Sequence, residues 1–284
     1  MAQIIDGKAL SAVIRERVKA RVAKLERPPA LAVVLAGNDA PSLVYVRNKE
    51  KACAEAGIRF VFHQLEENVS QKEMLALIDK LNADGDIDGV LIQQPNPLPP
   101  NLDMHEAVCR VDPLKDVDCL HPYNAGLVMA GTAAFLPATP AGVVAMLKES
   151  NIEMKGKRCV ILGRSNVVGK PLAMLMLQQN ATVTVCHSHT RDLREITRQA
   201  DILIAAVRQP LFVKADMIKE NAVVIDVGIN RLEGKKICGD ADYKDCFEKA
   251  SYITRVPGGV GPMTVAMLLE NCVKAYELRR GVRV

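Results

Sequence analysis

The segment from residue 42 to residue 57, SLVYVRNKEKACAEAG, places one lysine in an unusual setting. Tyr45 and Lys49 stand four residues apart, so both lie on the same face of a helix. That face continues with the apolar residues Ala52, Cys53 and Ala56. A lysine on an apolar face is partly withdrawn from water, which lowers its pKa and lets it act as a general acid or base. The alternative is that the stem of Lys49 packs along the face while its ammonium group reaches solvent at the edge.

Two polar residues outside this helix are candidates for the same chemistry. Gln93 ends the strand-like run GVLIQ, and in open α/β sheets ligands bind at the carboxyl ends of the strands. Asp118 lies in KDVD (115–118), shortly after Pro113, in a segment too polar for a protein core. Each also has an ordinary interpretation, Gln93 as a strand-end amide and Asp118 as a solvated loop carboxylate.

The run RCVILG (158–163) leads into GRSNVVGKP (163–171), which is typical of a strand that enters a helix through a glycine-bounded turn. Such a turn presents backbone N–H groups to a phosphate, and its first residues are Gly163, Arg164 and Ser165. It differs from the GxGxxG pattern because Ser165 stands in place of the middle glycine. The pattern indicates a dinucleotide site without proving one.

The next strand-like segment, ATVTVCH (181–187), bears on which dinucleotide is bound. It runs on into Ser188 and His189, without the acidic residue that binds the ribose hydroxyls of NAD. A carboxylate that would repel a 2′-phosphate is therefore missing, and Arg164, Ser188 and Arg191 are candidates to bind that phosphate. The residues favour NADP over NAD as the cofactor.

A third segment, PGGVGP (257–262), packs three glycines between two prolines. A backbone without side-chain bulk suits the close approach of a flat ligand, which makes Pro257, Gly258 and Gly261 candidate substrate contacts. A tight turn between two domains explains the segment equally well, and both interpretations can hold together.

Composition excludes several other classes of protein. The 284 residues are 49% hydrophobic, with a net charge of +4 and no Lys/Arg-rich run of the kind that binds nucleic acid, so anionic small molecules are the more natural ligands. The eight cysteines form no CxxC pair and the five histidines form one close pair, so we expect reduced thiols and no metal site. The opening MAQIIDGKAL lacks the layout of a signal peptide and no apolar run is long enough to span a membrane, which predicts a cytoplasmic protein.

Helical and strand patterns alternate along the chain, which predicts an α/β fold with largely parallel sheets. In the first half, an amphipathic helix over 6–26 precedes strands at 31–37, 58–65 and 88–94, with helices near 42–56 and 70–83 between them. Ser70 and Glu73 form a capping box at the start of the second of those helices.

Thr139 and Pro140 read as the N-cap and first position of a helix that opens a second domain. Strands at 158–163, 181–187, 200–207 and 222–229 then give that domain the layout of a doubly wound, Rossmann-type sheet. We therefore expect a catalytic domain over residues 1–138 and a nucleotide-binding domain over 139–263. A last helix, roughly 264–280 within the segment 264–284, is expected to return to the first domain.

Seven segments resemble, in this order and over nearly the whole chain, the bifunctional methylene-tetrahydrofolate dehydrogenase/methenyl-tetrahydrofolate cyclohydrolase family. They are SLVYVRNK, GVLIQ, KDVD with NAGL (124–127), PATPAG (137–142), GRSNVVGKP, DVGIN (226–230) and PGGVGPMT (257–264). The resemblance implies an N-terminal α/β catalytic domain, a Rossmann domain for NADP, a cleft between them, and a homodimer.

The resemblance also implies what each candidate residue does. Lys49 corresponds to the catalytic lysine of cyclohydrolysis, which Gln93 binds through a hydrogen bond. Tyr45 lines the folate site and Asp118 holds the amino edge of the pterin. Gly163, Arg164, Ser165 and Ser188 bind NADP, and Ile229 contacts its nicotinamide end.

The activity implied by the resemblance belongs to one-carbon metabolism and serves purine biosynthesis. The enzyme oxidises 5,10-methylene-tetrahydrofolate to 5,10-methenyl-tetrahydrofolate with NADP and hydrolyses the product to 10-formyl-tetrahydrofolate. Two other classes remain as alternatives. A Rossmann dehydrogenase for a hydroxy or amino acid would be separated from it by folate competition, and a non-catalytic nucleotide sensor would have no need of Lys49 and Gln93.

The chain departs from the usual family pattern at several positions. The stretch QQPNPLPP (93–100) differs from the common QLPLP through Gln94 and Asn96. Cys119 replaces the glycine of KDVDG, and Arg208 replaces the glycine of an AVG motif. Ala138 and Arg255 replace a cysteine and a proline in the PCTP and TPVPGG segments. None removes a catalytic side chain. Cys119 would shift Asp118 if the backbone needs a positive φ there, and Arg208 adds charge near the cofactor.

Overall fold

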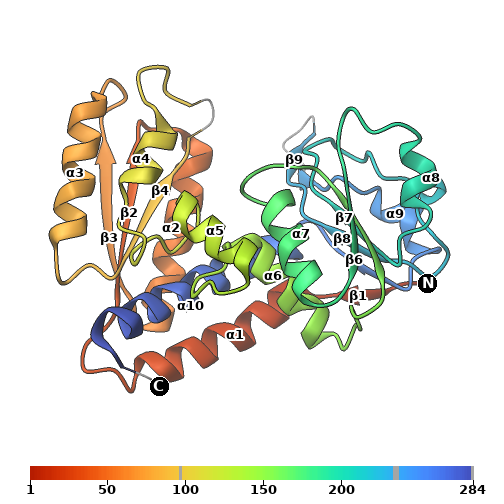
Figure 1. The fold of residues 1–284 in the computed structure, drawn as a ribbon, viewed down its shortest axis with the longest axis horizontal. Coiled ribbons are helices and arrows are strands. Elements are labelled where there is room, and N and C mark those ends of the chain that lie inside the picture. The colour runs from red at the N-terminus through yellow and green to blue at the C-terminus, as the bar shows by residue number, and fades with distance from the viewer. Residues whose placement is uncertain (96–97, 233–236, 283–284) are drawn as a thin grey trace. The chain divides into compact units, whose positions relative to one another are not determined.

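A computed structural model describes residues 1–95, 98–232 and 237–282 (Figure 1). The chain divides into two compact units. The three-stranded unit comprises Val13–Leu136 and Val265–Val284, and the six-stranded unit comprises Met1–Ala12 and Pro137–Thr264. Within the described residues, no helix combines the length and the apolar composition needed to span a bilayer. Both units are α/β structures built on parallel sheets, as the sequence predicts.

The three-stranded unit has a parallel sheet of strand order β3-β2-β4. Its strands are β2 (Ala30–Ala36), β3 (Arg59–Leu65) and β4 (Gly89–Gln93). Its helices are α2 (Ala40–Ala56), α3 (Gln71–Ala83), α4 (Met104–Arg110) and α5 (Pro122–Ala130), with most of α1 (Gly7–Val22) and α10 (Val260–Arg280).

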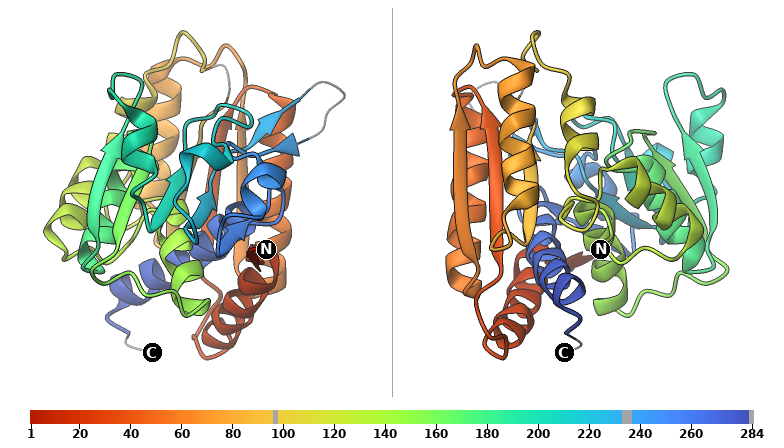
Figure 2. Two further views of the ribbon diagram at one scale, coloured as in Figure 1. Left: turned by 90° about the vertical axis from the view of Figure 1, so that its right-hand side faces the viewer. Right: turned by 60° about the vertical axis from the view of Figure 1, so that its left-hand side comes forward.

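The central strand β2 is buried along its whole length, as expected of a parallel strand covered on both faces. Alternate residues of β2, such as Ala32 and Val34, share a core with Met74 and Ile78 of α3. Figure 2 shows helices beside this sheet in both of its views. The expected capping box is present at the start of α3, where Ser70 and Glu73 bind each other's backbone N–H groups.

The six-stranded unit has a parallel sheet of strand order β1-β11-β8-β7-β5-β6. Its strands are β1 (Gln3–Ile5), β5 (Arg158–Leu162), β6 (Thr182–Cys186), β7 (Ile202–Ala205), β8 (Val223–Asp226) and β11 (Tyr252–Thr254). Its helices are α6 (Ala138–Glu149), α7 (Gly169–Gln178), α8 (Leu193–Thr197), the 3₁₀ turn η1 (Ala215–Met217) and α9 (Tyr243–Phe247). The short strands β9 (Asn230–Arg231) and β10 (Ile237–Cys238) pair separately and antiparallel.

The strand order of this second sheet has a functional consequence. The chain passes from β5 to β6 on one side and then returns to β7 on the other side of β5. This reversal is the topological switch point at which doubly wound sheets bind ligands, at the carboxyl ends of the strands. A dinucleotide is therefore expected over the carboxyl ends of β5, β6 and β7.

Three local features differ from the sequence-based expectation. Residues 1–12, placed with the first half of the chain, group with the six-stranded unit because β1 pairs with β11 at the edge of its sheet. Thr139 is not an N-cap, since α6 begins one residue earlier and the Thr139 hydroxyl bonds that of Thr264 at 3.0 Å. The last helix begins at Val260, so part of the glycine-rich segment is its first turn.

Candidate active site

Lys49 lies in the third turn of α2, and its surroundings are those of a desolvated titratable group. The helix starts at an N-cap, Asp39, whose side chain accepts from the N–H of Ser42 at 2.9 Å, and it ends at Gly57 in the left-handed conformation. Cys53, one turn after Lys49, is fully buried. Burial lowers the pKa of Lys49, and the neighbouring Asp118 carboxylate opposes that effect by raising it. The side chain is partly buried and does not simply extend into solvent.

Gln93 ends β4, and its side chain lies against Lys49. The Nζ atom of Lys49 donates to the Oε1 atom of Gln93 at 2.5 Å. The two residues are 44 positions apart, and they meet because α2 follows β2 and β4 pairs with β2. The carboxyl end of β4 and the apolar face of α2 thus converge on one ammonium group.

Asp118 is the third candidate residue near Lys49, and the pKa of its carboxyl group is raised. Burial raises the pKa of Asp118, Lys49 lowers it, and Asp116 raises it further. Its loop is held from the side by Asp116, which accepts from the N–H groups of Leu120 at 3.2 Å and His121 at 2.9 Å. The loop is thereby fixed with a carboxyl group beside a lysine.

Tyr45 lies one turn before Lys49 on α2 and exposes 46% of its surface. An exposed aromatic ring next to a desolvated lysine is available to stack on a planar ligand. The sequence-predicted residues Tyr45, Lys49, Gln93 and Asp118 therefore belong to one region of the three-stranded unit.

The glycine turn of the six-stranded unit lies at the switch point of its sheet. Gly163 follows β5 with a φ of 115°, and a Cβ atom on it would lie 2.2 Å from the carbonyl oxygen of Ala206, which follows β7. A Cβ atom on Gly169 would lie 2.1 Å from the carbonyl oxygen of Gly163. Both positions therefore require glycine for close backbone packing.

Ser165 helps to start α7 in place of the missing middle glycine. Its hydroxyl oxygen accepts from the N–H groups of Val168 at 3.2 Å and Gly169 at 3.4 Å. The turn therefore binds two of its own N–H groups internally, a detail that the glycine pattern does not predict. The Ser165 side chain itself stays exposed at the carboxyl end of the strand.

The remaining cofactor candidates surround that turn. Arg164 and Ser188 are exposed, and Ser188 follows β6 in the loop 187–190, where the N–H of His187 bonds Thr190 at 2.8 Å. Ile229 exposes 48% of its surface after β8. A cationic side chain, hydroxyl groups and a loop without carboxylates fit a dinucleotide that carries a 2′-phosphate.

Residues 255–259 connect β11 to α10 within the six-stranded unit, and Gly261 lies in the first turn of α10. The Val256–Pro257 peptide bond is cis, and Gly258 has a φ of 104°. The carbonyl of Gly258 accepts from the N–H of Lys8 at 3.0 Å, and Gly261 lies close to the Cδ1 atom of Ile229. The predicted substrate contacts of this segment and the predicted nicotinamide contact are thus neighbours.

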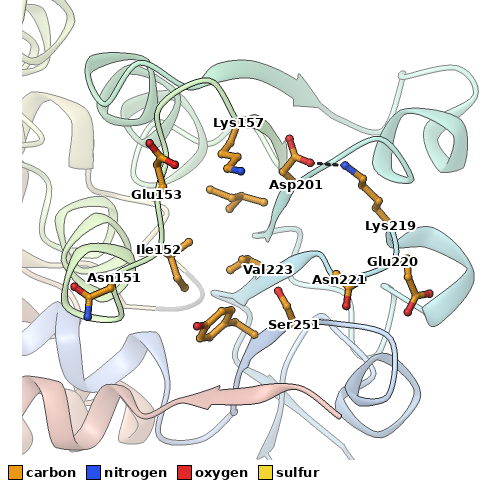
Figure 3. A pocket seen from close by; sticks show the side chains of 12 residues that line it. Asn151, Ile152, Glu153, Lys157, Asp201, Lys219, Glu220, Asn221, Val223 and Ser251 are labelled. Carbon is orange, nitrogen blue, oxygen red and sulfur yellow. Dashed lines mark hydrogen bonds and ion pairs between the residues drawn. The ribbon is translucent and has the colours of Figure 1, made fainter.

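The opposite, amino-terminal edge of the same sheet contains a polar cavity of about 350 Å³ (Figure 3). An ion pair lies in it, since Lys219 bonds the Asp201 carboxylate at 2.5 Å and Asp201 also accepts from the N–H of Arg158. This cavity lies at the starts of β5, β7, β8 and β11, whereas the glycine turn lies beyond the carboxyl ends of β5 and β7. It is distinct from the predicted cofactor site.

Comparison with known proteins identifies the family. Residues 5–118 match the tetrahydrofolate dehydrogenase/cyclohydrolase catalytic domain, and residues 137–280 match the NAD(P)-binding domain of the same family. The chain belongs to the tetrahydrofolate dehydrogenase/cyclohydrolase family. It is 53% identical to the bifunctional protein FolD of Acetivibrio thermocellus over 98% of each chain. It is 51% identical to FolD of Agathobacter rectalis, over 98% of this chain and all of that one.

Two solved structures of the family extend the likeness to the fold. The FolD dehydrogenase/cyclohydrolase of Campylobacter jejuni is 47% identical and superimposes with a TM-score of 0.96, covering 98% of this chain and all of that one. The Trypanosoma brucei FolD, solved with NADP and an inhibitor, is 38% identical with a TM-score of 0.93, covering all of this chain and 99% of that one. These likenesses confirm the resemblance and the α/β fold predicted from the sequence.

Two departures from the family pattern lie at strained backbone positions. Cys119 and Arg208 stand where the family motifs carry glycine, and each has a φ of 57°, in the left-handed region that disfavours a side chain. The condition under which Cys119 affects its neighbour Asp118 is therefore met. The Cys119 thiol is buried and donates to the carbonyl of Phe135 at 3.4 Å.

Sequence reasoning missed the residues that hold the KDVD motif in place. Lys115 is fully buried, and its Nζ atom donates to the carbonyl oxygens of Leu81, Asn82 and Asp84, each at 2.7 Å. The side-chain amide of Asn124 donates to Asp116 at 2.9 Å. The motif could have indicated them, because KDVD contains two further charged residues, Lys115 and Asp116, just before the candidate Asp118.

Proposed function

We propose that this protein oxidises 5,10-methylene-tetrahydrofolate to the methenyl form with NADP and hydrolyses that product to 10-formyl-tetrahydrofolate, with Lys49 as the group that moves protons. The observation that carries the assignment to Lys49 is its 2.5 Å hydrogen bond to Gln93 in a partly buried setting. A family member needs such a group, because water does not lose its proton readily at neutral pH.

The residues of the three-stranded unit supply binding and proton transfer. Tyr45 offers its ring to the planar part of the folate, and Asp118 accepts hydrogen bonds from the amino edge of the pterin. When bound, NADP accepts a hydride from the methylene carbon of the substrate. Further proposed substrate contacts are Pro257, Gly258 and Gly261, and Ile229 is the proposed contact of the nicotinamide end.

The hydrolytic step then opens the ring of the methenyl cation. The oxygen of water bonds to the cationic carbon and loses one proton, which passes to solvent. The oxygen then loses its second proton and forms the formyl C=O as the carbon–N5 bond breaks, and N5 gains a proton. Lys49 performs these transfers, and Gln93 orients its Nζ atom. Burial lowers the pKa of Lys49, which brings the ammonium and amine forms closer in energy, as proton shuttling requires.

The remaining proposals concern the setting of the enzyme. We propose a cytoplasmic homodimer that serves one-carbon metabolism, including purine biosynthesis, and that binds no nucleic acid. The dimer and the metabolic role are what the resemblance of its motifs to this family implies. A net charge of +4 without a basic run supports the last point.

A spectrophotometric assay for methenyl-tetrahydrofolate formation tests the proposed function. NADP is expected to support the reaction with a much higher kcat/KM than NAD, because Arg164 and Ser188 stand where NAD enzymes place an acid. Arg164→Ala should raise the KM for NADP well above any change in the folate KM, since a charge-assisted contact of roughly 1.5–3 kcal/mol is lost. Equal efficiency with both cofactors contradicts the proposed preference.

A further inference from the structure

A single carboxylate organises the loop that follows β7. Asp240 is fully buried, and its Oδ2 atom accepts from the N–H groups of Val207 at 2.7 Å and Arg208 at 3.0 Å. Its Oδ1 atom accepts from the N–H of Gln209 at 2.9 Å and from the amide of Asn230 at 2.8 Å. Three successive backbone N–H groups thus converge on one side chain, which is the anion-binding arrangement called a nest.

The nest explains the strained backbone at Arg208. A run of N–H groups points to one side only if the backbone alternates between right-handed and left-handed conformations, and Arg208 supplies the left-handed residue with its φ of 57°. The side chain of Arg208 is exposed, so its own packing does not impose this conformation. The hydrogen bonds to Asp240 therefore hold it.

A second buried carboxylate holds Asp240 in turn. Asp226, the last residue of β8, accepts from the N–H groups of Asp240 at 2.9 Å and Ala241 at 2.8 Å. Gly228 and Gly239 are required because their backbones lie directly against these two carboxyl groups. A Cβ atom on Gly228 would lie 2.3 Å from the Asp240 carboxyl, and one on Gly239 would lie 1.8 Å from that of Asp226.

This arrangement lies at the edge of the sheet where the cofactor is expected. Ala206 immediately precedes the nest, and its carbonyl oxygen packs against Gly163 of the phosphate-binding turn. Ile229 immediately precedes Asn230, whose amide binds Asp240. In a doubly wound sheet the strands after the switch point carry the second half of a dinucleotide, which for NADP is the nicotinamide half.

We propose that Asp240 is a positioning residue for the nicotinamide half of the cofactor: it binds the 207–209 nest and the side chain of Asn230, and so fixes the two loops between which that half lies. The proposal rests on the proposed function, since it takes NADP as the ligand. A carboxylate is required because all four of its partners are N–H donors and an amide side chain would oppose one of them with an NH₂ group.

The first test compares Asp240→Asn with Asp201→Asn. Asp201 is a matched control, because it also accepts from a backbone N–H in the same unit but lies at the opposite edge of the sheet. NADPH binding is measured by fluorescence titration, and methenyl-tetrahydrofolate hydrolysis without cofactor serves as an internal reference. Asp240→Asn should raise the Kd for NADPH about ten-fold or more while hydrolysis stays within about two-fold, and Asp201→Asn should change neither.

The second test keeps the core intact and changes only the exposed residue of the nest. Arg208→Gly retains the N–H and accepts a φ of 57° without strain, whereas Arg208→Pro loses the N–H and fixes φ near −65°. Both variants lack the guanidinium, so the comparison is free of its charge. The proline variant should bind NADPH about ten-fold more weakly than the glycine variant, and it decides the matter if Asp240→Asn does not fold.

The outcomes distinguish a failure of the proposed function from a failure of the positioning role of Asp240. A wild-type protein that does not bind NADPH overturns the proposed function itself. If the wild type binds NADPH but Asp240→Asn binds it equally well, or loses binding and hydrolysis in the same proportion, Asp240 is a structural residue only. Equal Kd values for the glycine and proline variants at position 208 overturn the positioning role as well.

Discussion

Each end of β4 lies near a lysine that is withdrawn from water. The two lysines differ in burial and in the number of hydrogen-bond acceptors around the ammonium group. Near the start of the strand, Lys115 is fully buried, and its ammonium donates to three carbonyl oxygens around the end of α3. At the carboxyl end, Lys49 is partly buried, and within the described residues its one hydrogen-bond acceptor is Gln93. All three protons of Lys115 have acceptors, whereas Lys49 keeps unused donors beside a carboxyl group.

On the proposed function, this difference shows which property distinguishes a proton-transferring lysine from a structural one. Burial lowers the pKa of Lys49, and it lowers the pKa of Lys115 to about 8, so a lowered pKa alone does not separate them. What separates them is free bonding capacity at the edge of a sheet where ligands bind. Lys115 stabilises the fold, and Lys49 remains available to a substrate.

The largest loss is expected for Lys49→Met, which keeps the stem of the side chain and removes the titrating amine. Hydrolysis of methenyl-tetrahydrofolate should fall about 10²–10⁴-fold, the range for losing a general acid–base group, and the dehydrogenase should fall less. Absorbance of the methenyl form, corrected for spontaneous hydrolysis, measures this. A folded Lys49→Met protein that hydrolyses at the wild-type rate would refute the assignment.

The matched change at the other end of the strand, Lys115→Met, should have the opposite profile. It leaves three carbonyl oxygens without their donor, each costing about 1–3 kcal/mol if it stays unsatisfied, with part of this recovered by removing a buried charge. We expect the free energy of unfolding to fall by roughly 2–4 kcal/mol in urea titrations, while kcat of the folded protein stays within a few-fold. A stable but inactive variant would contradict the division of roles.

Asp118→Asn is expected to change the titration of Lys49. The anionic carboxyl favours the ammonium form of Lys49, so a neutral side chain lets burial lower the pKa of Lys49 further. The limb of the pH profile of kcat for hydrolysis that reports Lys49 should therefore move to lower pH. Calorimetry should also show weaker folate binding with nearly unchanged NADP binding, and a pH profile that does not move would place the Asp118 charge away from Lys49.

The hydrogen bond between Lys49 and Gln93 was predicted from the family resemblance. The residue pattern by itself made each a separate candidate, Lys49 as a lone charge on an apolar helix face and Gln93 as an amide at the carboxyl end of a strand, where ligands bind. No local pattern predicts the burial of Lys115, because the polar KDVD segment is typical of a solvated loop. Only the folded chain brings the ammonium group of Lys115 to the carbonyl oxygens at the end of α3. The pairing of β1 with β11 was equally hidden, since three residues are too short for a recognisable strand.

The sequence predicts backbone strain at positions 119 and 208 only on the condition that φ is positive there. The motif comparison indicates that a glycine is replaced at positions 119 and 208, but the sign of φ at those positions comes from the folded chain. At position 208 the buried Asp240 imposes it through three N–H groups. The residue that creates the strain thus lies 32 positions from the residue that bears it, beyond the reach of local sequence patterns.

Replacement of Cys119, which follows Asp118 in the chain, should change stability only slightly. Cys53, one turn after Lys49 in α2, is the matched control because it is also a buried free thiol, in ordinary helical backbone. At Cys53, alanine should be more stable than glycine by about 1 kcal/mol, as in any helix interior. At Cys119 both replacements lose the thiol, but alanine keeps the left-handed strain that glycine relieves, so the order should reverse, with glycine about 1 kcal/mol more stable. Urea unfolding of the four variants measures both differences, and hydrolysis by the position 119 pair reports whether Asp118 stays in place. If alanine were more stable than glycine at both positions, Cys119 would bear no strain, and its replacement of glycine would leave the loop that contains Asp118 unaffected.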